Sequence, residues 1–472
     1  MKMFINGEWK KSPQLIEVRN PFDQSVIDTV PAANNSDVEK AIAGAEEGAK
    51  IMAKIPAFDR AKILRKTADL MLEHADDFAK TISMEEGKIL AEAQLEATRA
   101  AEVMQLSSEE AKRLCGEVLP MDAAPGAAGK MGFTLRVPCG LVAAITPFNF
   151  PLNLVCHKVG PALAGGNSVI IKPASDTPLS ALKLVEVLLE AGAPPQAITC
   201  LTGAGSTVGS ALSSDRRIRK ISFTGSYEIG DKICRNAGMK RVTMELGSNS
   251  PLIIMEDANL QKVVEATAIT GYANAGQVCI SAQRVLAQDN IYDEFLDRLQ
   301  KRVETISTGD QLNKNTGMGP MIREADAKRV SHWIKESISG GARLITGGER
   351  KGTMMEPSIL AEVDPKMKIS CDELFGPAVA VTAFNDINQA IAMANDTRFG
   401  LSAGIFTQDI DHALHFANKV EIGNININWG PQYRVDLMPY GGLKDSGIGK
   451  EGPRYAIKEM TEVKMVMVHL GP

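Results

Sequence analysis

Short apolar runs alternate with amphipathic stretches through the middle of the 472-residue chain. Helical periodicity appears between several of these runs, as at Pro178–Ala191, where a proline in the first turn favours a helix start. Apolar strands that alternate with helices are typical of a parallel, doubly wound sheet. A second α/β stretch runs from Pro251 to about Asn428. The predicted strands of the first sheet are Leu141–Ile145, Ser168–Ile171, Ile198–Leu201, Lys220–Phe223 and Val242–Leu246.

The segments outside this core follow other patterns. Residues 36–110 are rich in Ala, Glu and Lys with helical spacing, and Ser36–Glu39 has the form of a capping box. The glycine- and proline-rich segment Gly116–Arg136 predicts a long hairpin, which we expect to pair with another chain. Alternating residues in Thr461–Val468 predict one more strand at a sheet edge.

Composition excludes several classes of function. Hydrophobic residues make up 44% of the chain and charged residues 23%, and the net charge is −5. These values fit a soluble globular protein that binds neither nucleic acid nor an anionic membrane. Met1–Trp9 lacks the apolar segment of a secretory signal, and no apolar run is long enough to cross a bilayer. The seven cysteines show no zinc-like spacing, so we predict no metal, and reduced thiols in the cytoplasm.

Two residues in glycine-punctuated segments carry the candidate chemistry, Cys279 in Ala275–Ile280 and Glu245 in Val242–Gly247. A thiolate can attack a carbonyl carbon and hold the product as a thioester. A buried carboxylate of raised pKa can activate the water that hydrolyses it. With a hydride acceptor, these groups suit oxidation of an aldehyde to an acid. Taken alone, however, a free cysteine is more often a buried structural residue.

Seven short motifs favour the chemical interpretation. In their order they resemble the NAD(P)-dependent aldehyde dehydrogenase superfamily over nearly the whole chain, most closely its lactaldehyde and glycolaldehyde dehydrogenase-like members. Any single motif could arise by chance, but seven in register are specific. The motifs are Thr146–Pro151, Ile171–Ser175, Phe223–Ser226, Glu245–Gly247, Gly276–Cys279, Glu373–Pro377 and Pro439–Gly442.

The resemblance implies an aldehyde dehydrogenase-like fold, with two doubly wound α/β domains and a β oligomerisation arm. Residues 1–115 and 137–246 would form the NAD(P)-binding domain, and residues 247–430 the catalytic domain. Residues 116–136 and 455–472 would form the oligomerisation region of a homodimer or homotetramer.

The resemblance also implies the catalytic roles. Cys279 would be the nucleophile, and the Asn149 side-chain amide and the Cys279 backbone N–H would stabilise the oxyanion. Hydride would pass to NAD or NADP, and Glu245 would be the general base that hydrolyses the thioester. On spacing alone, Asn149 fits a turn before Phe-Pro equally well.

The predicted cofactor site lacks the common Gly-x-Gly-x-x-Gly fingerprint. Gly203–Gly205 resembles its start, but Gly209 comes one residue late, so a flexible turn explains these glycines about as well. Phe223–Ser226 ends a strand and opens a helix, where backbone N–H groups favour a pyrophosphate. By resemblance, Glu373 and Phe375 orient the nicotinamide ribose and ring. The predicted set is Thr146, Pro147, Phe148, Lys172, Ser175, Gly205, Gly209, Phe223, Thr224, Gly225, Ser226, Leu246, Gly247, Glu373 and Phe375.

Two positions depart from the family pattern. Lys172 would meet the adenosine ribose, and Ser175 stands where NAD-preferring members often carry a glutamate that repels a 2′-phosphate. We therefore predict that NADP is accepted. Ser248 stands where many members carry a glycine. It could narrow the cofactor's resting positions or alter Glu245 mobility, and either effect predicts a changed rate of thioester hydrolysis.

Substrate specificity is less firmly indicated. Members that bind anionic substrates often place an arginine just before the cysteine, but Val278 stands there, which favours a short aliphatic, hydroxylated aldehyde. Asn153 and His157 are candidate substrate residues by resemblance. Arg434 could bind an anionic tail such as a sulfonate or carboxylate, or it could pair with Asp436 or a neighbouring subunit.

Two rival functions remain open to test. A coenzyme A-acylating dehydrogenase would release the acyl group to a thiol, but such enzymes often lack the general-base glutamate that Glu245 supplies. A catalytically silent binding protein on the same scaffold would be expected to lack Cys279, Glu245 or Asn149, and all three are present.

Overall fold

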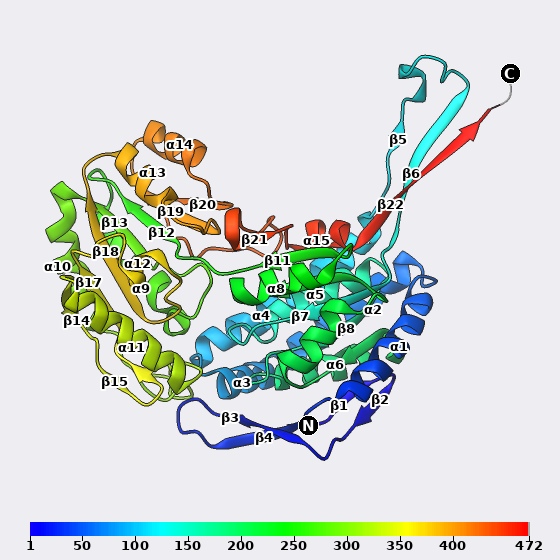
Figure 1. Cartoon of the computed structure of the whole chain (residues 1–472), viewed down its shortest axis with the longest axis horizontal. Coiled ribbons are helices and arrows are strands. Elements are labelled where there is room, and N and C mark those ends of the chain that lie inside the picture. Colours follow the sequence, from blue (N-terminus) through cyan, green and yellow to red (C-terminus); the bar gives the residue numbers. More distant parts are fainter. Residues whose placement is uncertain (471–472) are drawn as a thin grey trace.

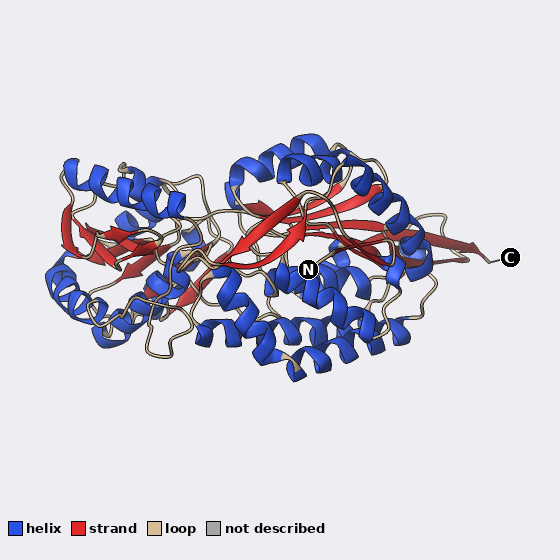
Figure 2. Ribbon diagram, turned by 90° about the horizontal axis from the view of Figure 1, so that it is seen from below, coloured by secondary structure: helices blue, strands red, loops and turns tan. Residues whose placement is uncertain are grey.

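A computed structural model describes residues 1–470 of the chain. Two α/β lobes lie side by side, and a long β arm projects from one of them (Figure 1). Seen from below, helices cover both faces of the larger sheet (Figure 2). This architecture confirms the predicted α/β class.

The larger sheet has eight strands, of which the central five are parallel. Its buried strands lie within two residues of the predicted bounds. In spatial order the strands are β2 (Glu8–Lys10), β1 (Met3–Ile5), β9 (Ile198–Cys200), β8 (Ser168–Lys172), β7 (Leu141–Ile145), β10 (Ile218–Thr224), β11 (Arg241–Glu245) and β21 (Gly447–Ile448).

The strand order reverses between β7 and β10. The chain runs from β7 outward through β8 to β9, and then returns to add β10 and β11 on the other side. In a doubly wound sheet, ligands bind at such a reversal, outside the carboxyl ends of the strands. The segments that leave β7 and β10 here are Thr146–Pro151 and Gly225–Ser226, both parts of predicted motifs.

The second sheet has seven strands, and only its edge strand β14 is antiparallel. This confirms the second α/β unit expected between Pro251 and Asn428. In spatial order the strands are β14 (Arg343–Thr346), β17 (Ser358–Ala361), β18 (Ala378–Phe384), β13 (Arg284–Gln288), β12 (Pro251–Ile254), β19 (Ser402–Phe406) and β20 (Asn424–Ile427).

The predicted helical region, residues 36–110, forms four helices, but the predicted capping box is wrong by two residues. Asn34 is the N-cap of the first helix, and its side chain accepts from the Asp37 N–H while Asp37 accepts from the Asn34 N–H. Ser36 lies inside the helix, and the reciprocal hydrogen bonds expected between Ser36 and Glu39 are made by Asn34 and Asp37 instead. The helices are α1 (Asn35–Met52), α2 (Ala57–Glu73), α3 (Ala75–Glu86) and α4 (Leu90–Arg113).

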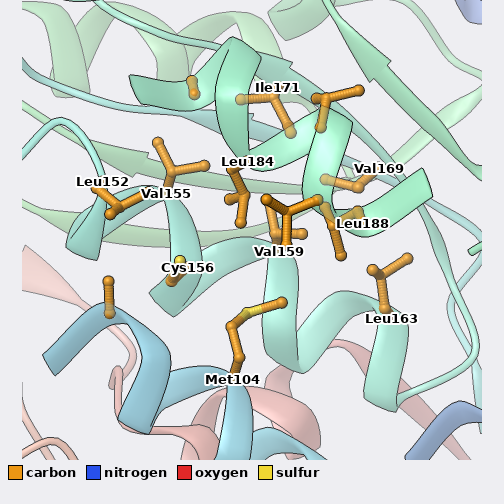
Figure 3. Packing of buried hydrophobic residues seen from close by; sticks show 14 of the residues in the cluster. Met104, Leu152, Val155, Cys156, Val159, Leu163, Val169, Ile171, Leu184 and Leu188 are labelled. Atoms are coloured by element: carbon orange, nitrogen blue, oxygen red, sulfur yellow. The ribbon is translucent and has the colours of Figure 1, made fainter. Parts of the chain in front are cut away.

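The core of the larger lobe forms where helices pack on the parallel sheet (Figure 3). Helix α5 (Asn153–Ala164) is buried along its whole length, since α4 covers it on the side away from the sheet. Leu184 and Leu188 of α6 (Leu179–Glu190) pack in the same cluster as Val159 of α5. Burial on all sides fixes α5 rigidly behind the strand-end segment Thr146–Pro151.

The arm is a three-stranded antiparallel sheet. Strand β22 (Thr461–His469) pairs with β6 (Lys130–Pro138) over nine residue pairs, and β6 pairs with β5 (Val118–Leu119). The hairpin and the edge strand predicted from the sequence are therefore confirmed as elements, and they join each other.

The remaining elements complete the two lobes. Among the described residues, no helix is long and apolar enough to cross a membrane. The elements are the hairpins β3 (Leu15–Arg19) with β4 (Val26–Pro31) and β15 (Arg350–Lys351) with β16 (Met354–Met355), and helices α7 (Ser210–Ser214), α8 (Tyr227–Ala237), α9 (Leu260–Tyr272), α10 (Tyr292–Val303), α11 (Glu324–Ser339), α12 (Lys368–Cys371), α13 (Ile387–Asn395), α14 (Ile410–Lys419) and α15 (Pro453–Glu459).

Candidate active site

Cys279, Glu245 and Asn149 line one cavity of about 420 Å³. Glu245 is the last residue of β11, and Asn149 lies in the segment that leaves β7. Cys279 comes from the other lobe, a few residues after α9. The structure therefore brings together three residues that lie up to 130 positions apart (279 minus 149).

A tight turn presents Cys279 to the cavity. Asn274, Ala275 and Gly276 have φ angles of +51°, +52° and +70°. A Cβ at Gly276 would lie 2.1 Å from the Gly376 carbonyl oxygen, so only glycine fits. The left-handed backbone of this turn sets the position of Cys279 relative to the cavity.

Asn149 is fixed from both ends. Its side-chain Nδ2 donates to the Gln277 carbonyl at 2.9 Å, beside the Cys279 turn. Its own carbonyl accepts from Lys88 Nζ at 2.7 Å, and Lys88 is a buried cation that also donates to Glu96 at 2.6 Å. A donor held in this way costs little reorganisation when charge develops nearby.

The Glu245 carboxyl is buried, and both of its oxygens lack a hydrogen-bond partner in the described residues. Burial, together with the negative charge of Glu451, raises the pKa of Glu245 well above its usual value. An unpartnered carboxyl that faces a cavity is suited to bind a water and to take its proton.

The Cys279 side chain is half-buried in the cavity wall, and its Sγ lies 3.2 Å from the Tyr440 hydroxyl oxygen. Burial raises the pKa of this thiol to about 12, although the contact with Tyr440 acts in the opposite direction. Loss of water disfavours the charged thiolate, so the hydrogen bond from Tyr440 is the nearest compensating interaction.

A second cavity of about 540 Å³ adjoins the first, since five residues from the ends of β7 and β10 line both. All fifteen residues of the predicted cofactor set line one or both cavities. Features of the wall fit a dinucleotide: Thr146 Oγ1 is buried without a partner, and open space lies where a Cβ would stand at Gly205 and Gly209.

Glu373 folds onto the backbone after β11. A Cβ at Gly247 would lie 2.3 Å from Glu373 Oε2, and the Ser248 N–H donates to Glu373 Oε1 at 3.0 Å. Burial raises the pKa of Glu373 to about 7. The Ser248 side chain is buried and its hydroxyl contacts Ser250 Oγ at 3.0 Å. The effect of Ser248 on Glu245 stays a prediction.

Asn153, His157 and Arg434 line neither cavity. Asn153 is buried at the start of α5, with its Oδ1 unpartnered. Arg434 donates to His157 Nδ1 at 3.1 Å and to Glu451 at 3.3 Å, and His157 Nε2 lies 2.8 Å from Asp436. Burial, followed by the charge of Arg434, lowers the pKa of His157 to about 4.

Sequence patterns did not single out the buried ions behind the site. Lys158 donates to Glu451 at 2.6 Å and to Thr224 at 2.7 Å, and Arg99 binds Asp436 through two hydrogen bonds of 3.0 and 2.8 Å. The two ion pairs, Lys158–Glu451 and Arg99–Asp436, join residues 293 and 337 positions apart, too far for any local pattern. Tyr440 stood inside a quoted motif, but only the fold shows its contact with Cys279.

The fold and the composition of the site fit a nicotinamide-dependent dehydrogenase that has a cysteine nucleophile. A groove at the reversal of a doubly wound sheet is where a dinucleotide binds, and a thiol lines the cavity that adjoins this groove. The chain belongs to the aldehyde dehydrogenase family, whose model matches residues 9–466.

Relatives agree with this assignment. The chain is 44% identical to a 3-sulfolactaldehyde dehydrogenase of Priestia aryabhattai, covering 99% of this chain and 98% of the relative. It is 39% identical to a lactaldehyde dehydrogenase of Methanococcus aeolicus, covering 99% and 100%. A crystal structure of an NADP-dependent enzyme of E. coli superposes with a TM-score of 0.96 at 38% identity, covering 99% and 98%.

The protein is therefore an NAD(P)-dependent aldehyde dehydrogenase, which oxidises an aldehyde to the acid. The predicted family, fold and cofactor class are confirmed. The roles of individual residues are taken up below as proposals.

Proposed function

We propose that Cys279 attacks the aldehyde carbon, that Asn149 and the Cys279 N–H stabilise the oxyanion, and that Glu245 activates the hydrolytic water. The shared cavity of these three residues, continuous with the dinucleotide-sized groove, is the observation that supports this most strongly. Bound NAD or NADP supplies the hydride acceptor.

Side chains of the cavity account for thiol attack, for stabilisation of the oxyanion and for hydrolysis of the thioester. The thiol gives up its proton to solvent, and the thiolate forms a C–S bond while the C=O π electrons move to the aldehyde oxygen as negative charge. The Asn149 amide lies beside the Cys279 turn to meet that charge. After oxidation the thioester carbon accepts water, whose proton passes to Glu245, and the C–S bond breaks. Glu451 is the neighbouring charge that raises the pKa of Glu245, and buried Lys158 pairs with Glu451 and so limits its repulsion of the Glu245 carboxylate.

We propose a short, hydroxylated aliphatic aldehyde as the substrate. Upstream of Cys279, Asn274 is neutral, and its Nδ2 and backbone N–H donate to Glu86 at 2.8 Å and to Glu92 at 3.2 Å. This turn therefore offers no cation to an anionic substrate. The lactaldehyde dehydrogenase relative supports the same substrate class.

An anionic aldehyde is a second candidate, and one observation favours it. The Nε–H of Arg434 is buried without a hydrogen-bond partner, although Nε lies 3.8 Å from Asp436 and the rest of the guanidinium is paired. A sulfonate or carboxylate oxygen would satisfy this donor. The 3-sulfolactaldehyde dehydrogenase relative supports this alternative.

A panel of aldehydes separates the two candidates. We expect kcat/KM for lactaldehyde or glycolaldehyde to exceed that for 3-sulfolactaldehyde and succinic semialdehyde by about tenfold or more, because the cations near the thiol are already paired. NADH and NADPH formation at 340 nm measures each rate, with Cys279→Ser protein as the blank. A higher kcat/KM for the anionic aldehydes would favour the second candidate. Absence of NAD and NADP reduction with every aldehyde would contradict both candidates.

We also propose that NADP is accepted. At the ribose end of the groove, Lys172 Nζ donates only to the neighbouring Pro173 carbonyl at 3.0 Å, and the Ser175 hydroxyl donates to the Gly203 carbonyl at 3.1 Å. The nearby Asp176 is engaged by Arg323 through two hydrogen bonds, which offsets its charge. A cation beside a neutral hydroxyl can accept a 2′-phosphate.

Replacement of Ser175 by glutamate tests this proposal. We expect the ratio of kcat/KM with NADP to that with NAD to fall by about tenfold or more, because the carboxylate would repel the phosphate. Ser175→Ala is the matched control, since it removes the hydroxyl without adding charge. Failure of the unaltered protein to use NADP would overturn the proposal.

Assembly and domain organisation are proposed on structural grounds. Val118 is 79% exposed, and apolar residues of β6 and β22, such as Leu135 and Met467, are also exposed along the arm. Such an exposed apolar edge favours pairing with a second copy, in a homodimer or homotetramer. The two sheets support the proposed domains 1–115 with 137–246, and 247–430. Seven free cysteines support a reducing, cytoplasmic location.

A further inference from the structure

The hydroxyl of Tyr440 is committed to the candidate nucleophile. Tyr440 is 3% exposed, and its oxygen lies 3.2 Å from Cys279 Sγ. Within residues 1–470 this hydroxyl has no other hydrogen-bond partner. A buried tyrosine hydroxyl normally has a partner, so the sulfur is what satisfies this one.

The direction of the hydrogen bond follows from the charge state of the sulfur. With a neutral thiol, either group can donate. Once Cys279 is deprotonated the sulfur carries no hydrogen, and only the phenol can donate. The contact therefore strengthens as the nucleophile forms, because hydrogen bonds to an ionised acceptor are the stronger kind.

Arg434 lies against the other side of the same residue. The centre of its guanidinium stands 4.0 Å from the centre of the Tyr440 ring. A cation over an aromatic ring is attracted to its face, and it makes the phenol hydrogen more acidic and a better donor. Glu451 and Asp436 hold the guanidinium in this place through ion pairs of 3.3 and 3.8 Å.

The two carboxyls near the thiol act against the thiolate. The charges of Glu373 and Glu245 raise the pKa of Cys279, and only the charge of Arg434 acts in the opposite direction. Among the groups around the sulfur, Tyr440 is therefore the direct donor that offsets burial.

We infer that Tyr440 is a catalytic residue that donates a hydrogen bond to the Cys279 thiolate, and that Arg434 is a positioning residue that acts through the Tyr440 ring. This rests on the proposed role of Cys279 as nucleophile. The geometry gives Arg434 a function at the site that does not require contact with substrate.

Replacement of Tyr440 by phenylalanine isolates the hydroxyl, since the ring and its contact with Arg434 are retained. The readout is the alkylation rate of Cys279 by iodoacetamide in the full-length protein without cofactor, measured for each cysteine by peptide mass spectrometry over a range of pH. Exposed Cys115 in the same sample is the internal reference. Tyr292→Phe is the control variant, because the Tyr292 hydroxyl bonds only to backbone groups of another region.

In Tyr440→Phe we expect Cys279 to be alkylated roughly three- to tenfold more slowly at each pH below the pKa of the thiol. Loss of a hydrogen bond to a charged group lowers the thiolate fraction, and the greater nucleophilicity of the more basic thiolate recovers only part of the rate. The Cys115 rate and the Tyr292→Phe profile should not change. An unchanged Cys279 profile in Tyr440→Phe would overturn the inference.

A second measurement serves if Tyr440→Phe does not fold. Biosynthetic replacement of tyrosine by 3-fluorotyrosine makes the phenol more acidic and should speed Cys279 alkylation relative to Cys115, and no change would overturn the inference. The proposed function is tested by a different measurement. Absence of NADH and NADPH formation by the unaltered protein would contradict it, whatever the alkylation profile of Cys279 shows.

Discussion

Cys279→Ser protein is expected to lose about 10⁴-fold or more of kcat, with binding of NADP retained. A serine hydroxyl is a far weaker nucleophile than a thiolate, and the hydrogen-bond partner at this position, the Tyr440 hydroxyl, is not a base that could activate it. Steady-state NADPH formation measures the loss, and fluorescence titration measures cofactor binding. Cys115→Ser is the matched control, because Cys115 is exposed and lies outside both cavities.

This result also separates the enzyme from a silent binding protein on the same scaffold. Mass spectrometry of unaltered protein, quenched during turnover, should show an acyl mass on the Cys279 peptide and on no other. Full activity in Cys279→Ser would remove the cysteine from the mechanism.

Glu245→Gln protein is expected to keep the first burst of NADPH and to lose about 10²- to 10⁴-fold of steady-state turnover. Glutamine preserves the shape of the side chain but cannot take a proton from water, so the thioester forms and then persists. Rapid-mixing absorbance shows the burst, and the acyl mass on Cys279 shows the trapped intermediate. Glu46→Gln, an exposed change on α1, is the control.

The pH dependence follows from the carboxyl's surroundings. Burial and Glu451 raise the pKa of Glu245, and only the deprotonated form acts as a base. Steady-state turnover limited by hydrolysis should therefore rise with pH through a pKa well above 4.5, and this rise should be absent in Glu245→Gln. Loss of the burst itself would assign Glu245 to the first half of the reaction instead. Release of the acyl group only to added coenzyme A would favour the acylating rival.

Where the candidate residues follow strand ends, motif spacing predicted which segments the fold brings together. Thr146–Pro151 and Phe223–Ser226 leave adjacent parallel strands, and since the carboxyl ends of such strands meet at one edge, their side chains reach one groove. Alternation of apolar and polar residues likewise predicted a strand at Thr461–Val468, but its pairing with β6 came only from the structure. Local patterns are reliable there because each strand or turn sets its own conformation.

The candidate substrate residues could not be judged in the same way. Arg434, His157 and Asp436 form one buried network, because each buried charge or ring nitrogen needs a partner that only tertiary structure supplies. The capping box failed for a related reason: Asn34–Asp37 and Ser36–Glu39 both fit the pattern, and the chain uses the first. Sequence alone does not rank two adjacent candidates of equal chemistry.

The route of the chain through the larger lobe has a consequence for biosynthesis. N-terminal segments leave the ribosome first, at about 5–20 residues per second, and domains fold as they emerge. The segment 434–451 supplies Tyr440, Glu451 and the edge strand β21 to a sheet whose other strands end at Glu245. A nascent chain therefore carries its reactive thiol and its base before it carries their partners, and the enzyme becomes competent only when synthesis of the second lobe is over.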